Sequence, residues 1–257
     1  MSMGSQFVGA GDPEATVLFA RLFAYLVIAG AATVLLGYLV GYVRYVLAEG
    51  FRYEWGYLAV GIGAAIVYGV AGIASQLIAE PWLDVFVEGA VLFFILFVAL
   101  GIRAMYHVQR SGEESSPLLP VWADYLVIAV FIVAWWAGFL TGNAWTRPVV
   151  AVGWVGASIW AVMYGVQTVR VHEGTSLAAL TRHLLPAILC VVVVVLTDLV
   201  GEFAGIDPAF VDAVWLVVTI LVGAFLFNTA VAIRQQGGEV QRMYDWTTWR
   251  QQSVDER

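Results

Sequence analysis

Carboxylates that border long apolar runs are the residues of this chain best placed to do chemistry. Asp84 and Glu88 are four residues apart, as are Asp198 and Glu202, so each pair shares one face of its segment if that segment is helical. An ionised carboxylate inside a bilayer is costly, so such groups face a bundle interior, take up a proton or bind a cation. Together with Asp212 they predict a proton or cation site. The alternative is that they lie in water at two helix ends.

Tryptophans provide a second candidate site. Trp154, Trp160 and Trp215 lie within apolar runs and are candidates to line an internal pocket for a noncovalently bound retinoid or isoprenoid. Aromatic side chains also fill helix interfaces and face lipid, which is the alternative interpretation. Asn228 and Thr229 are candidates for a hydrogen bond between helices.

Other cofactor and catalytic chemistry has little support in the sequence. A membrane haem needs opposed imidazoles within the apolar region, whereas the three histidines fall at the ends of apolar runs, at His107, His172 and His183. Cys190 is the only cysteine, and the sequence has no metal-ligand spacing, nucleophile–base pair or glycine-rich phosphate loop. We therefore expect neither an enzyme nor a metal site.

The composition selects a membrane protein. Of 257 residues, 61% are hydrophobic and only 12% are charged, about half the charged fraction of ordinary soluble domains. The 19 acidic residues outnumber the 12 arginines and the chain has no lysine, so it offers no dense basic surface for nucleic acid. An acidic, lysine-free surface is typical of halophilic proteins, and we expect a halophilic archaeal source.

Seven uncharged runs predict an all-α bundle of seven transmembrane helices in the cell membrane, at 22–43, 55–79, 89–102, 125–146, 148–169, 184–197 and 213–233. At 1.5 Å per residue, the runs at 89–102 and 184–197 are too short for a hydrocarbon core of about 30 Å. We therefore expect the third helix to begin near Pro81 and the sixth to end near Gly205.

Arginine positions predict the direction of the spans. Most arginines fall in alternate connections and in the C-terminal tail, so the N-terminus is predicted outside and the C-terminus in the cytoplasm. The expected parts are an extracellular segment (1–16), a transmembrane domain (17–236) and a cytoplasmic tail (237–257). Gly237-Gly238 is expected to end the seventh helix, and the tail to form a short helix at the membrane surface.

Residues between the last two predicted spans resemble a known family. Glu202, the run Ala204-Gly205-Ile206, Pro208 and Asp212 follow the order and spacing of the loop between the last two helices of microbial (type 1) rhodopsins. Asp12-Pro13-Glu14 and Trp82-Leu83-Asp84 are similar to that family's opening and to its third-helix counterion motif. The resemblance implies the bacteriorhodopsin-like bundle of seven helices, in which retinal forms a Schiff base with a lysine of the last helix.

The chain departs from this family at the residue that binds its cofactor. Carrying the loop alignment forward places Ala224 where the family has its lysine and Ile220 where it has a counterion. Because the chain has no lysine, no side chain can form the Schiff base, so no covalent cofactor is expected. The residues then indicate an opsin-like scaffold without covalent retinal.

The leading functional hypothesis is a sensory, regulatory or assembly component of the membrane. It would act through lipid contacts, another membrane protein or a second copy of itself, by analogy with the family's signalling members. One alternative is a proton or cation conductor that uses the extracellular-side carboxylates. Another is a haem-binding electron-transfer protein that uses the histidines.

Purified protein mixed with all-trans-retinal and then reduced with borohydride is expected to carry no retinyl group on any side chain, because the chain lacks lysine. Peptide mass spectrometry is the measurement. A retinyl group mapped to an internal peptide would contradict the expectation.

Overall fold

A computed structural model of the chain describes residues 13–46, 52–78, 80–110, 121–141, 146–171 and 176–255. All regular structure within these ranges is helical, which confirms the predicted all-α class. The helices are α1 (Pro13–Val46), α2 (Arg52–Leu77), α3 (Pro81–Arg110), α4 (Val121–Thr141), α5 (Thr146–Val171), α6 (Ser176–Ala204) and α7 (Pro208–Asp255).

Among the described residues, six helices are long and apolar enough to cross a membrane: α1, α2, α3, α5, α6 and α7. In α4 the apolar segment is shorter, Tyr125–Ala137. The predicted extensions of two helices are confirmed, since α3 begins at Pro81 and α6 ends at Ala204.

The turn between α6 and α7 shows why these helices end where they do. Gly205 follows the last residue of α6 with φ of 62°, a left-handed conformation that favours glycine after a helix. Asp207 then caps α7, because its Oδ1 accepts a hydrogen bond from the Ala209 backbone N–H at 3.0 Å. Pro208 occupies the first helical position, where its missing N–H costs nothing.

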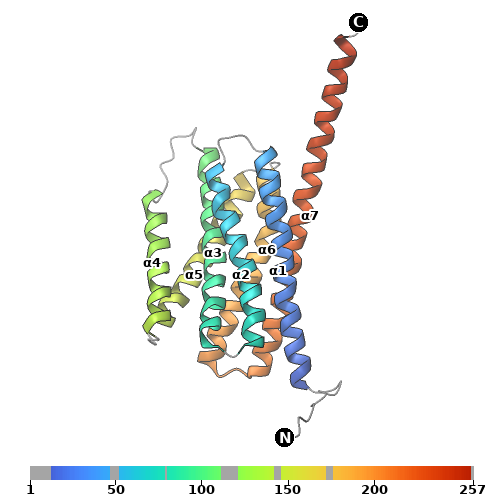
Figure 1. Ribbon diagram of the computed structural model, residues 1–257. Helices are drawn as coiled ribbons and strands as arrows, with labels where there is room; N and C mark the ends of the chain where they lie inside the picture. The colour runs from blue at the N-terminus through green and yellow to red at the C-terminus, as the bar shows by residue number, and fades with distance from the viewer. Residues whose placement is uncertain are drawn as a thin grey trace.

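Six helices form a closed ring, in which α1 packs between α2 and α7, α3 between α2 and α5, and α6 between α5 and α7. Figure 1 shows α4 beside this ring, against α3 and α5. The largest fully buried side chains of the interior include Ile28, Leu58, Ile62, Leu92, Ile95, Ile188 and Leu226.

Trp135 attaches α4 to the bundle. Its indole N–H donates a hydrogen bond to the Val85 carbonyl oxygen of α3 at 3.1 Å. Its ring also meets the rings of Phe86 and Phe93 edge to face, with centroids 5.5 and 5.7 Å away. Trp135 thus joins α4 to α3 through one hydrogen bond and two aromatic contacts.

Glycines bring α2 and α7 onto α1. A Cβ atom at Gly69 would lie 2.7 Å from the Tyr25 carbonyl oxygen and 2.7 Å from Ala29 Cβ, so only glycine fits this contact. A Cβ atom at Gly223 would lie 2.6 Å from Val27 Cγ1. Small residues allow such close approach between membrane helices, where apolar burial alone does not favour association.

The predicted helix break at Gly237-Gly238 is wrong, because α7 continues without interruption to Asp255. Figure 1 shows this last part of α7 projecting past the end of the ring opposite the start of α1. A glycine costs a helix interior only about 1 kcal/mol relative to alanine, too little to end a helix that is already formed.

Gly69→Ala is expected to lower the free energy of unfolding by about 1–3 kcal/mol, because the added methyl group meets α1 backbone atoms that cannot yield. Gly63→Ala on the same helix is the matched control. Nothing lies within 4 Å of its Cβ position, so it is expected to be neutral or to stabilise by up to about 1 kcal/mol. Denaturant unfolding of both variants in detergent is the measurement; equal stabilities would refute the contact.

Candidate functional site

A cavity of about 320 Å³ lies at the end of the bundle where α1 begins, and we call it the vestibule. All helices of the ring contribute to it. The described residues that line it are Arg21, Tyr25, Tyr68, Ser75, Gln76, Asp84, Val87, Glu88, Val91, Trp154, Val194, Val195, Asp212 and Trp215.

An ion pair between α1 and α7 forms part of the vestibule wall. Arg21 Nη2 lies 2.6 Å from Asp212 Oδ1, and the two side chains are 34% and 51% exposed. The Arg21 guanidinium carbon also lies 5.9 Å from the centroid of the Trp215 ring. Because water screens a partly exposed pair, it contributes only about 0–1 kcal/mol to stability.

Three of the five predicted carboxylates line the vestibule. Asp84 and Glu88 enter it from α3 and Asp212 enters it from α7, and all three are exposed. The structure therefore brings these acids together in an open cavity rather than in a dry interior. Asp198 and Glu202 lie in the last two turns of α6, and their side chains are outside the described part of the structure.

Aromatic residues cover other walls of the vestibule. Trp154 of α5 and Trp215 of α7 both line it. The Tyr25 ring meets the rings of Trp215 and Tyr68 edge to face, with centroids 5.1 and 5.3 Å away. Two predicted pocket tryptophans thus share one cavity, together with two tyrosines that no sequence pattern singled out.

The other two predicted pocket residues lie elsewhere. Trp160 lines a separate apolar cavity of about 230 Å³ between α3, α4 and α5. Ala224 is exposed on α7, because the interior face of that helix carries Thr219, Val222 and Leu226 instead. Four predicted residues therefore do not form one pocket, since each residue turns a helix by about 100° and the loop alignment does not fix the helix face.

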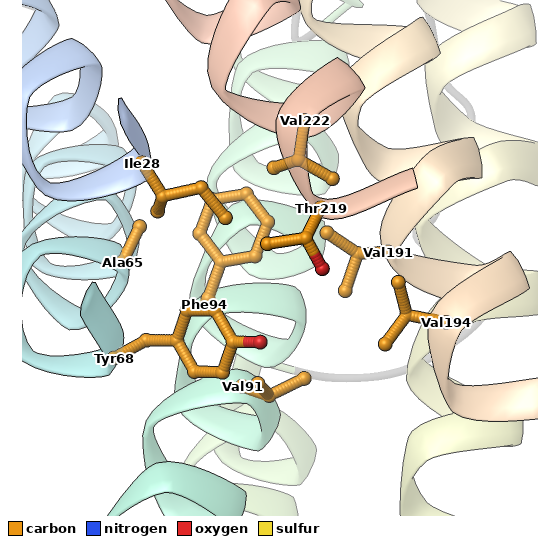
Figure 2. A pocket seen from close by; sticks show the side chains of 9 residues that line it. All are labelled: Ile28, Ala65, Tyr68, Val91, Phe94, Val191, Val194, Thr219 and Val222. Carbon is orange, nitrogen blue, oxygen red and sulfur yellow. The ribbon is translucent and has the colours of Figure 1, made fainter. Parts of the chain in front are cut away.

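A smaller cavity of about 20 Å³ lies at the centre of the bundle (Figure 2). It shares Tyr68, Val91 and Val194 with the vestibule, so the two spaces adjoin. Figure 2 shows the Thr219 hydroxyl directed into it. Thr219 is 1% exposed, and its Oγ1 has no hydrogen-bond partner among the described residues. The space accommodates about one water molecule.

A buried arginine lies near the opposite end of α3. Arg103 is only 3% exposed, and its guanidinium carbon lies 5.7 Å from the centroid of the Trp160 ring. In the sequence, Arg103 directly follows the third apolar run, so it is interpreted only as a charged residue outside the span. A single arginine forms no sequence pattern that predicts burial by tertiary packing.

One residue of the predicted polar pair of α7 contacts a histidine of α6. Asn228 Nδ2 lies 3.2 Å from His183 Nδ1, so the predicted hydrogen bond between helices joins α6 and α7. The Thr229 hydroxyl donates instead to a carbonyl oxygen of its own helix. The side chain of His107 and the whole of His172 lie outside the described residues.

Comparisons with known proteins find no family model that matches this chain and no matching curated protein.

Proposed function

We propose that the chain is an opsin-like, seven-helix membrane protein without covalent retinal that serves as a sensory or regulatory component. It receives a signal in the vestibule and transmits it through α7 to a membrane partner or to lipid on the other side. In this proposal α4 is the remaining span, the vestibule opens outside the cell, and the C-terminus is cytoplasmic.

Helix length and arginine positions support this topology. The 21 residues of α4 extend roughly 30 Å at 1.5 Å per residue, about the thickness of the hydrocarbon core. Arg170 and Arg182 lie near the ends of α5 and α6 that are opposite the vestibule, and Arg234 lies at the end of the apolar span of α7. Positive residues near span ends favour the cytoplasmic side.

The continuity of α7 is the observation that carries the proposal. Near its start, Asp212 and Trp215 line the vestibule, and Thr219 then lines the central cavity. The same helix continues to Asp255, past the ring of helices (Figure 1). A helix shifts as a stiff unit, so a displacement at the vestibule is carried along its length.

The cation or proton conductor is the second candidate, and the carboxylates of the vestibule favour it. Conduction also needs a polar path to the other side. From the vestibule towards the middle of the bundle, the space narrows to the central cavity. The described lining of that cavity is valine, isoleucine, alanine and phenylalanine apart from Tyr68 and Thr219. This apolar constriction supports the sensory proposal over the conductor.

A distance measurement between the cytoplasmic end of α5 and the end of the apolar span of α7 tests transmission. Spin labels at R170C and R234C, both exposed positions, are introduced into the C190A background and read by pulsed electron paramagnetic resonance. Asp212→Asn removes the negative charge of α7 that attracts Arg21 and is expected to shift the mean distance by about 1–2 Å.

Glu80→Gln is the matched control, because it makes a similar change at an exposed residue of the α2–α3 turn and leaves α7 untouched. An unchanged distance in Asp212→Asn would contradict transmission through α7. Cation flux into liposomes that Glu88→Gln abolishes would favour the conductor instead.

A further inference from the structure

We propose that the vestibule binds a small organic cation of the quaternary ammonium or amine class. This assignment rests on the proposed function, because it names the chemical class of the signal that the vestibule receives.

The charges of the vestibule favour a cation. Among the described residues, its lining contains three carboxylates, Asp84, Glu88 and Asp212, and one guanidinium, that of Arg21, which together carry a formal charge of −2. Arg21 pairs with Asp212 of α7, and the other two carboxylates both lie on α3. An anionic ligand is repelled by this field, and a cation is drawn to the wall that α3 supplies.

The aromatic walls favour an organic cation over a metal ion. Trp154, Trp215, Tyr25 and Tyr68 line the vestibule, and aromatic rings attract weakly hydrated ammonium groups. Arg21 already illustrates this attraction, since its guanidinium lies 5.9 Å from the Trp215 ring centroid. Within the described residues, no group of three or more histidine, cysteine, aspartate or glutamate side chains is arranged to hold a metal ion.

The size of the vestibule and the central cavity next to it also fit an occupant. A volume of about 320 Å³ is near the lower end of the range for small-molecule sites, about 300–1,000 Å³. The adjoining central cavity contains the Thr219 hydroxyl, which is buried and has no hydrogen-bond partner among the described residues. One water or one hydroxyl group of a ligand would satisfy it, because the central cavity has room for little more.

Isothermal titration calorimetry of the purified full chain in detergent tests the assignment, with choline and tetramethylammonium as probes. The neutral control is 3,3-dimethylbutan-1-ol, which has the shape of choline but no charge. Both cations are expected to bind saturably, and the neutral analogue at least about tenfold more weakly because it loses the cation–π and carboxylate attraction.

Variants locate the binding site. Glu88→Gln is expected to weaken choline binding about tenfold, because it removes one charge from the vestibule and keeps the shape of the side chain. Glu80→Gln makes the same change at an exposed residue that does not line the vestibule, and is expected to leave binding unchanged.

Absence of saturable cation binding, equal binding of the neutral alcohol, or full binding in Glu88→Gln would each overturn the assignment. The outcome is separable from that of the proposed function. Choline binding without transmission through α7 would leave the ligand class in place and contradict the sensory role. Transmission through α7 without choline binding would support the sensory role and contradict the ligand class.

Discussion

The close approach of α2 and α7 to α1 is the constraint on which the rest of the bundle depends. Lipid tails are as apolar as the helix surfaces, so dense packing has to hold membrane helices together. Gly69 and Gly223 permit that packing on either side of α1. As a result Tyr25 lies between Tyr68 and Trp215, and Arg21 of α1 reaches Asp212 of α7. The vestibule and its charge pattern follow from these contacts.

Helix bounds were predictable where chain length and local chemistry agreed. The short apolar run at 89–102 required α3 to begin near Pro81, and the run at 184–197 required α6 to continue to the glycine at 205. Prediction failed at Gly237-Gly238, because glycine weakens a helix by about 1 kcal/mol per residue without ending it. A pair of glycines identifies a position of low helix propensity, but whether the helix continues there also depends on the turns on either side.

The vestibule was only partly predictable for a similar reason. The four-residue spacing of Asp84 and Glu88 is enough to place both carboxylates on one helix face. Arg21 and Thr219 gave no such pattern, since their importance arises from α1–α7 packing and from burial at the centre. Trp154 and Trp160 are six residues apart, which turns them to different faces of α5, and helical periodicity applied to this pair would have separated them.

Thiol accessibility at Gln76 measures most directly whether an aqueous vestibule opens to the outside of the cell. In the C190A background, Q76C lies in the vestibule wall and R170C lies at the exposed opposite end of α5. A membrane-impermeant maleimide added to intact cells is predicted to label Q76C, whereas R170C reacts only after the cells are opened. Labelling of R170C but not Q76C in intact cells would contradict both the orientation and the open vestibule.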